Sequence, residues 1–549
     1  MGEDGRRKIT IRKLSADFPP AALADAAAKL AGLKRLITGG RQVAEGLGRL
    51  VQHLKQVAAP AGEPFVFTAR LADNERLLRE EFADCDDVRY RSFTAGGRRV
   101  LLVYLRGMTD QTLLEKDVME TLMAPSEKEK PTVTLESLIN TLVTAASLAV
   151  SNSPREAIVT VMRGRTLLLV DGLSQGLLVG AVKHVKRAVE ESRTEAVARG
   201  PHDAFNETLE DNIVLIRRRA ADPDVKVKLK TIGTRSRTEV VLVYAASLVK
   251  PGLVAELERR LGRVKVDRLL LAAQVEEFII DHPWSPFPQT QFTERPDTFL
   301  AAVYEGKVGL IVDNTPNALI VPCTLSALLQ STEDFTVQPV VASLIRLTRY
   351  LAVFLGIFLP AMYVAFVSYN PGMLPTTLAI TVAELRARTP YPAFMEVIIM
   401  EVILELFQEA VVRLPQKVAP GASILGAFVI GTTIVQAGIV NALLVVATAG
   451  TAIASYTMPA YNLGLALRWL RLPTVVAAAV LGFYGIALAY LALIVHLCSL
   501  RSFGESYLGG LFDVTLMEDM KDKLVRLPAT WQKERPKQLG PQERTRAGE

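Results

Sequence analysis

Three glutamates at helical spacing are the residues of this 549-residue chain whose types and positions could do chemistry. Glu401, Glu405 and Glu409 lie in the predominantly apolar segment 393–412, and a helix would place their carboxylates on one face. Like charges in a row destabilise one another, and carboxylates that face lipid are costly. The acidic stripe therefore predicts contact with water, either at a membrane interface or along a hydrated cavity.

Three interpretations of this stripe stay open on the sequence alone. An amphipathic helix over 393–412 could lie on the membrane surface with its acidic face in water. The stripe could instead line a pore and favour cations, which makes Glu401, Glu405 and Glu409 pore-lining candidates. Basic residues of another subunit could also pair with the three carboxylates.

No enzymatic chemistry is visible elsewhere in the chain. Five histidines and three cysteines are scattered without the spacing of a zinc site, and no Gly-x-x-x-x-Gly-Lys-Ser/Thr phosphate loop occurs. We expect no catalytic residues, no metal and no cofactor, and a protein that is not an enzyme. The net charge of +6 comes without a basic stripe interleaved with aromatic residues, so no nucleic-acid partner is expected.

Long segments without Asp, Glu, Lys or Arg predict a membrane-embedded half. The segment 418–467 would reach roughly 75 Å as one helix, about twice the thickness of a bilayer, so it reads as two crossings joined by a turn. Two more charge-free segments have apolar cores at 351–367 and 474–494. These segments predict an all-α polytopic transmembrane bundle at 342–508, with about four or five spans plus the acidic amphipathic helix 393–412.

Polar and prolyl residues interrupt this predicted bundle. Proline inside a crossing bends the helix, and asparagine and proline favour turns between crossings. Basic pairs flank the crossings, and we expect Arg468 and Arg471 to close the long apolar segment. The structural or gating candidates are Pro360, Asn370, Pro371, Pro375, Asn441 and Pro459.

The distribution of basic residues leaves two topologies open. Five crossings would put the C-terminus outside, whereas four would bring both termini to the cytosolic side. The basic tail 511–549 and the absence of an apolar signal segment favour a cytosolic soluble region and cytosolic termini. The same tail predicts contact with anionic lipids.

The soluble half contains an internal duplication. Segments 73–172 and 211–314 share four landmarks in the same order, including a strand that ends at Tyr104 or Tyr244 and a later strand that ends at Asp171 or Asp313. The separations between these tyrosines and aspartates are 67 and 69 residues. Valine- and leucine-rich runs bounded by Gly and Asp indicate strands, and segments with 3.6-residue periodicity indicate helices. We therefore predict two duplicated α/β subdomains, at 63–198 and 199–335, after a variable, partly disordered or helical extension at 1–62.

Several motifs in both halves are similar to those of the A subunits of GerA-family nutrient germinant receptors, which are spore germination proteins. The resemblance covers roughly residues 64–508. It is carried by Ser153-Pro-Arg-Glu-Ala157, Gly200-Pro-His-Asp-Ala-Phe205, Asn212-Ile-Val-Leu-Ile-Arg-Arg-Arg219, Ser285-Pro-Phe-Pro-Gln289, Thr293-Glu-Arg-Pro296, Leu347-Thr-Arg-Tyr-Leu351, Asn370-Pro-Gly-Met-Leu-Pro375 and Ser499-Leu-Arg-Ser-Phe-Gly504.

This resemblance implies a multi-pass protein of the spore inner membrane or cell membrane, with its soluble region on the core side. It further implies B- and C-type receptor subunits as partners, and nutrient sensing that opens an ion-conducting or signalling assembly. We expect a homo-oligomer within the membrane. The alternative is a non-conducting membrane scaffold of a germination or dipicolinate-release complex.

Overall fold

A computed structural model gives the fold of the chain. It describes residues 66–123, 135–141, 147–183, 195, 197, 199–415, 421, 426, 429–509 and 522–546. The predicted extension 1–62 lies outside the described residues, as does the first part of the predicted tail 511–549.

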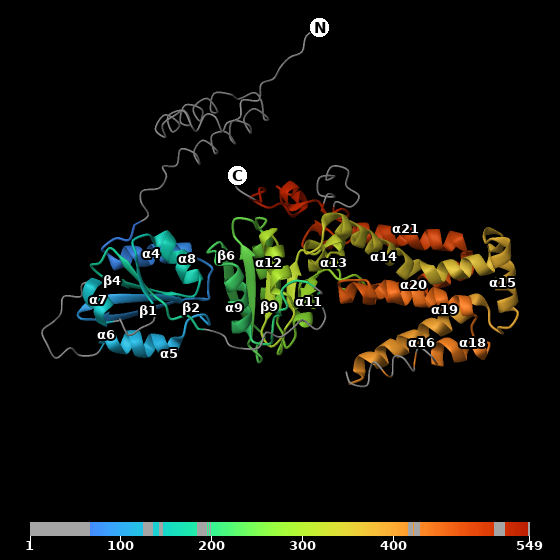
Figure 1. The fold of residues 1–549 in the computed structure, drawn as a ribbon, viewed down its shortest axis with the longest axis horizontal. Helices are drawn as coiled ribbons and strands as arrows, with labels where there is room; N and C mark the ends of the chain where they lie inside the picture. Colours follow the sequence, from blue (N-terminus) through green and yellow to red (C-terminus); the bar gives the residue numbers. More distant parts are fainter. Residues whose placement is uncertain are drawn as a thin grey trace, which may run out of the picture.

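The first α/β unit is an antiparallel sheet covered by helices on both faces (Figure 1). Helices α4 and α8 pack on one face, and α5, η2, α6 and α7 lie along the other. Strand β2 is buried on both sides, which explains its almost unbroken run of Val and Leu. The strand order is β1-β2-β4-β5-β3, with bounds β1 Val88–Ala95, β2 Arg98–Leu105, β3 Leu148–Ser151, β4 Thr166–Val170 and β5 Gly176–Val179. The helices are α4 Leu71–Glu81, α5 Gln111–Leu113, η2 Leu114–Glu120, α6 Thr121–Met123, α7 Leu135–Thr141 and α8 Pro154–Met162.

The second unit repeats this arrangement. Its sheet has the order β6-β7-β9-β10-β8, with α9 and α12 on one face and α10 and α11 on the other. The strands are β6 Val225–Ile232, β7 Thr238–Ala245, β8 Gln291–Thr293, β9 Val308–Val312 and β10 Ala318–Val321. The helices are α9 Leu209–Arg219, α10 Leu253–Arg263, α11 Ala272–Ile279 and α12 Pro296–Tyr304.

Equivalent residues occupy equivalent places in the two units. Val100 pairs with Val170 in the first sheet, and Val240 pairs with Val312 in the second. An asparagine in the first turn of α4 or α9 closes the preceding loop in both units. The Asn74 amide donates to the Thr68 carbonyl at 2.7 Å, and the Asn212 amide donates to the Asn206 carbonyl at the same distance. The sequence landmarks thus coincide with a repeat of topology, register and loop hydrogen bonding.

Buried polar contacts join the two units. The Arg217 guanidinium binds the Asp87 carboxylate at 2.7 Å and 3.0 Å, with both side chains almost fully buried. Beside this ion pair, the Asp86 amide donates to the Val227 carbonyl at 2.8 Å. The cavity lined by Asp86 and Asp87 measures only about 20 Å³. That space holds about one water molecule, so this joint is not an open ligand cleft.

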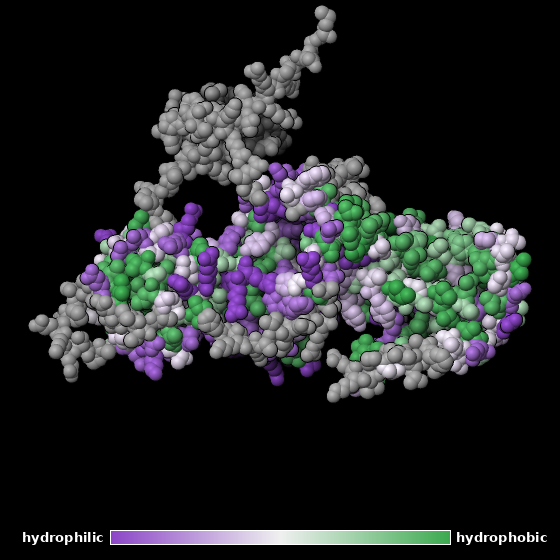
Figure 2. Space-filling view, in the orientation of Figure 1, coloured by the Kyte–Doolittle hydropathy of each residue, from purple (hydrophilic) through white to green (hydrophobic). Residues whose placement is uncertain are grey.

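The helical region follows the second unit and extends away from it (Figure 1). Its surface is largely apolar in the view of Figure 2, in contrast with the mixed surface of the α/β units. Among the described helices, α14 and α20 are long and apolar enough to cross a membrane, and α19 and α21 are shorter apolar helices. The bounds are α14 Pro339–Ser368, α15 Thr376–Arg386, α16 Ala393–Arg413, α18 Ile434–Gln436, α19 Ala442–Tyr456, α20 Tyr461–Leu481 and α21 Phe483–Ser499.

Two helix boundaries differ from the sequence-based expectation. Arg468 and Arg471 do not close the apolar segment but lie within α20, because other helices supply partners for both guanidinium groups. The predicted apolar core 474–494 is not one helix, because the chain turns at Gly482 between α20 and α21. Gly482 has φ +60°, and an added Cβ would lie 2.9 Å from the Tyr369 ring. Hydropathy is continuous through this turn, so it gives no signal for it.

The chain returns from α21 to the second α/β unit. Ser502 Oγ, in β11 (Arg501–Ser502), donates to the Gln289 carbonyl at 2.9 Å, and the Phe503 amide donates to Asp281 at 2.7 Å. Further along, Arg546 binds the Glu305 carboxylate at 3.0 Å. The described part of the basic tail therefore contacts the protein, and this arginine is already paired there.

Candidate functional site: buried ion pairs of the helical region

Arg471 connects four helices. Its side chain is 2% exposed, and its Nε donates to the Gly356 carbonyl of α14 at 2.7 Å. Its Nη2 reaches α19, where it donates to the Thr451 carbonyl and to the Ser455 hydroxyl. Its Nη1 lies 3.2 Å from Oε2 of Glu401 on α16. A single guanidinium on α20 thus binds groups of α14, α16 and α19.

The Glu401–Arg471 pair is only partly satisfied. Glu401 is 8% exposed, and its Oε1 has no hydrogen-bond partner within the described residues. A buried charge is tolerated when a partner neutralises it, and removing one partner is strongly destabilising. The pair therefore fixes how α16 packs on α20.

The other glutamates of the stripe become more exposed toward the end of α16. Glu405 lies 3.5 Å from Arg468 and its side chain is 42% exposed, whereas Glu409 lies 2.5 Å from Arg413 and is 61% exposed. Each carboxylate of the stripe thus has an arginine partner, and these partners belong to the same chain. Glu401 lies inside the protomer, and only Glu405 and Glu409 reach its surface.

Glu396 forms a second buried polar cluster, near the start of α16. Its carboxylate is fully buried and accepts from Thr389 Oγ1 at 2.9 Å and from the Asn441 amide at 3.3 Å. Asn441 also binds the Tyr363 hydroxyl and caps α19 by accepting from the Leu444 amide at 2.9 Å. Of the predicted candidates, Asn441 is thus a helix cap that links α14, α16 and α19. Sequence reasoning left Glu396 out of the site because it does not share the spacing of the stripe.

The proline candidates lie at helix ends and within one helix. Pro360 is buried inside α14, and Asn370 and Pro371 begin a short 3₁₀ turn, η4 (Pro371–Met373), after that helix. Pro375 immediately precedes α15, and Pro459 lies between α19 and α20. Proline at such positions commonly bends or ends a helix. A gating role for them stays a prediction.

Asp334 joins α14 to the segment that follows the second α/β unit. Its fully buried carboxylate, in the short helix η3 (Thr332–Phe335), binds Arg346 Nε at 3.0 Å and Arg349 Nη1 at 2.9 Å. Arg346 also lies 3.4 Å from Asp522 of the tail. Arg346 and Arg349 are one of the basic pairs that flank the predicted crossings, and their shared acidic partner was not predicted. The signal for it is Asp334 itself, which follows Ser331 at capping-box spacing.

One serine motif has the sequence pattern of a hydrolase nucleophile but not its structural setting. Gly172–Gly176 has the pattern Gly-x-Ser-x-Gly, with Ser174 at its centre. It connects the antiparallel strands β4 and β5, whereas a nucleophile elbow lies between a strand and a helix. In the part of the chain that the structure describes, no group of three or more His, Cys, Asp or Glu side chains could hold a metal ion.

Comparison with known proteins decides the family. The model of the Bacillus/Clostridium GerA spore germination protein family matches residues 76–538. The chain belongs to the GerA family. Its relatives in this family include spore germination protein B1 of Bacillus subtilis (strain 168), 34% identical over 87% of this chain and 98% of the relative.

Other GerA relatives are similarly extensive. Spore germination protein GerLA of Bacillus cereus is 35% identical over 84% of this chain and 94% of its own length. The uncharacterized membrane protein YfkQ of B. subtilis (strain 168) is 37% identical over 83% of this chain and 88% of its own length. The crystal structure of the N-terminal domain of the A subunit of the Bacillus megaterium spore germinant receptor GerK3 is 25% identical. It covers 48% of this chain and 98% of that domain, with a TM-score of 0.38. The predicted family is confirmed.

Proposed function

We propose that this chain is the A subunit of a spore germinant receptor and acts as its membrane signalling component. The observation that carries the proposal is the GerA match over residues 76–538, which includes both α/β units and all the apolar helices. The subunit would assemble with B- and C-type receptor subunits and perform no catalysis of its own.

Contiguous contacts support a signalling route from the α/β region to the helices. Asp334 holds Arg349, in the third turn of α14. Seven residues further along the same helix, about 10 Å at the rise of an α-helix, the Gly356 carbonyl accepts from Arg471. Arg471 in turn binds Glu401. A displacement of the α/β region would therefore reach the centre of the helical region through α14.

We place the α/β region and the tail on the cytosolic, spore-core side of a multi-pass protein. In support, the start of α14, which carries Arg346 and Arg349, and the end of α21 both adjoin the second α/β unit (Figure 1). Cytosolic flanks of membrane helices are enriched in such basic residues. We further propose a location in the spore inner membrane or cell membrane, with anionic lipids nearby.

In the ion-channel-like form of the proposal, a homo-oligomer encloses a hydrated path lined by α16. Glu405 and Glu409 are the candidates to face it, because their side chains are exposed. Glu401 would instead hold α16 on α20. A second candidate function, a non-conducting scaffold, is favoured by a different feature. Each glutamate of the stripe already has an arginine partner, so the net charge offered to cations is small.

Cation flux from liposomes separates these two functions. The subunit, reconstituted with its partner subunits, is compared with a Glu405→Gln, Glu409→Gln double variant. The matched control is Glu384→Gln, an exposed glutamate of α15. A channel predicts a flux that the double variant lowers and the control leaves unchanged. Flux that is absent, or insensitive to the double variant, would favour the scaffold.

A further inference from the structure

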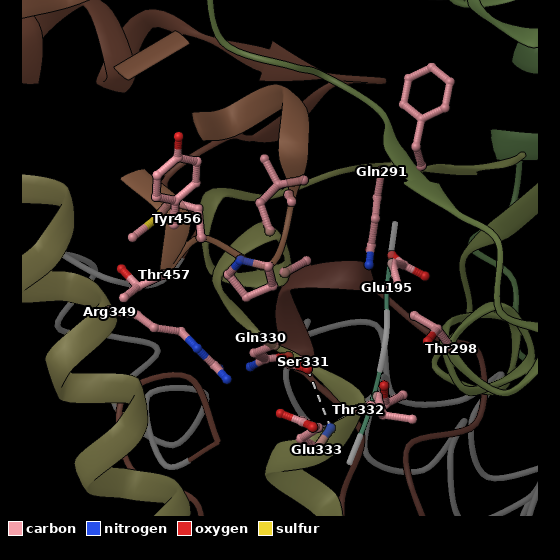
Figure 3. A pocket seen from close by; sticks show the side chains of 17 residues that line it. Glu195, Gln291, Thr298, Gln330, Ser331, Thr332, Glu333, Arg349, Tyr456 and Thr457 are labelled. Carbon is pink, nitrogen blue, oxygen red and sulfur yellow. Dashed lines mark hydrogen bonds between the residues drawn. The ribbon is translucent and has the colours of Figure 1, made fainter. Parts of the chain in front are cut away.

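A cavity lies where the second α/β unit meets the helical region. It has two lobes, of about 270 Å³ and about 220 Å³. Strand β8, the segment 327–333, Arg349 and the loop between α19 and α20 contribute to the larger lobe (Figure 3). The two lobes share Glu195, Phe292, Leu328, Pro459 and Ala460. The cavity therefore touches both halves of the protein.

The guanidinium of Arg349 lines this cavity and is hydrogen-bonded through only one of its three nitrogens among the described residues. The residue is 7% exposed, and its Nη1 is held by Asp334 at 2.9 Å and by the Leu329 carbonyl at 3.1 Å. Among the described residues, its Nε and Nη2 have no hydrogen-bond partner. Figure 3 shows its nitrogens pointing into the space beside Gln330 and Ser331. A guanidinium that is buried, fixed at one nitrogen and open at the others is a preformed anion site.

The opposite wall carries a carboxylate. Glu195 lines both lobes, and its Oε2 accepts from Thr293 Oγ1 at 2.7 Å. Burial raises the pKa of Glu195 to about 7. In Figure 3, Glu195 and Arg349 lie on opposite sides of the view, with Ser331 and Thr332 along its lower part.

We propose that this cavity binds a small organic monocarboxylate, whose carboxylate is held by Arg349 and whose other end carries a hydrogen-bond donor that faces Glu195. The planar guanidinium fork matches a carboxylate in two parallel hydrogen bonds. A doubly charged phosphate would meet the lining carboxylates of Glu195 and Glu333 more unfavourably than a singly charged carboxylate would. The volume suits a molecule smaller than the drug-sized ligands of larger pockets.

The bound molecule would connect three parts of the protein. It would contact β8 of the second α/β unit, α14 through Arg349, and the loop between α19 and α20. Binding would thus act on the same arginine that joins α14 to Asp334. The inference concerns a ligand site and does not depend on whether the subunit conducts ions.

Cysteine labelling of the full chain in detergent tests the site. Cys85 and Cys323 are buried and Cys498 is exposed, so the background carries Cys498→Ser. Ala460→Cys then places a thiol in the wall of both lobes. Its labelling rates are measured with anionic sulfonatoethyl and cationic trimethylammonioethyl methanethiosulfonate. Thr377→Cys, exposed on α15, is the matched control.

We expect labelling at both Ala460→Cys and Thr377→Cys, because the first lines the cavity and the second is exposed. Adding 4-hydroxybutyrate, a monocarboxylate with a terminal hydroxyl, should slow labelling only at Ala460→Cys. Replacing Arg349 by Gln should weaken this protection about tenfold, the effect of a lost charge-assisted hydrogen bond. Arg349→Lys keeps the positive charge and should weaken the protection less. It replaces Arg349→Gln as the test if the Gln variant destabilises the fold.

Several outcomes would overturn the proposal. A thiol at position 460 that neither reagent reaches would mean that no accessible cavity exists. Protection by 4-hydroxybutyrate that survives Arg349→Gln would remove the role of the arginine. Equal protection by inorganic phosphate or by sodium chloride would show a general anion effect instead of a carboxylate site. Loss of ion flux by itself would bear only on the proposed function.

Discussion

Arg471 and Glu401 form a buried ion pair that joins α20 to α16, with 3.2 Å between Nη1 and Oε2. The same guanidinium also binds backbone groups of α14 and α19. One side chain thus holds four helices together, and the stability of the helical region should depend on it more than on any exposed ion pair.

Replacing Arg471 by Met should lower the free energy of unfolding by about 3–5 kcal/mol, because Glu401 would keep a buried charge without a partner. Thermal unfolding in detergent measures this loss. Arg413→Ala breaks the exposed Glu409 pair and should change the free energy by only about 0–1 kcal/mol. Adding Glu401→Leu to Arg471→Met should restore much of the stability. Equal effects of Arg471→Met and Arg413→Ala would contradict this account.

Asp334→Asn tests the joint between the α/β region and α14. Arg346 and Arg349 share this carboxylate, so its neutralisation leaves two buried guanidinium groups without their common partner. We expect a loss of about 3–5 kcal/mol, and faster protease cleavage near residues 335–339. Asp267→Asn is the control, because Asp267 forms an exposed pair with Arg235 at 3.9 Å. A variant as stable and as resistant as this control would rule out a strong joint.

The pH dependence of stability should carry a contribution from Glu195. Its pKa is raised from 4.5 to about 7 by burial, so the folded state binds this proton more tightly than the unfolded state. Its contribution to the free energy of unfolding is largest below pH 4.5, falls as the pH rises, and levels off above about pH 7.

Glu195→Gln should remove this contribution. Relative to the unmodified protein, the variant should gain stability between pH 5 and 8, on the order of 3 kcal/mol at the upper end. Thermal unfolding midpoints across this pH range provide the measurement. Glu207→Gln, at an exposed position, is the control. Parallel pH profiles for Glu195→Gln and the unmodified protein would refute the assignment.

Gly482→Ala should destabilise the turn between α20 and α21. The glycine has φ +60°, which disfavours any side chain, and a Cβ there would lie 2.9 Å from the Tyr369 ring. Strain of this kind costs about 1–3 kcal/mol. Gly372→Ala is the control, since a Cβ at that position meets nothing within 4 Å. A thermal midpoint unchanged in Gly482→Ala would show that the turn relaxes freely.

The internal duplication could be recognised because each pattern occurs twice. The segments around Tyr104 and Tyr244 could be matched to one another, and each lies in a buried strand that carries an almost unbroken apolar run. Hydropathy likewise located α14 and the bounds of α16 to within a residue.

The misplaced helix end at Arg468 and Arg471 has a physical cause. A charge in an apolar segment is conventionally read as a helix end, yet Arg471 lies mid-helix because its partners come from three other helices. Such partners are distant in sequence and leave no periodic signal. The spacing of Glu401, Glu405 and Glu409 was sufficient to recognise the stripe, but not to tell the buried carboxylate from the exposed ones.

The return of the chain to the second α/β unit has a mechanical consequence. Asp334, in the segment that follows the second α/β unit, binds α14, and Gln289 and Asp281 of that unit bind the segment after α21. A rotation of the second α/β unit together with the segment that holds Asp334 would therefore act on α14 and α21 at the same time. Cutting the chain after Ser499 would separate α21 from the segment that binds Gln289 and Asp281.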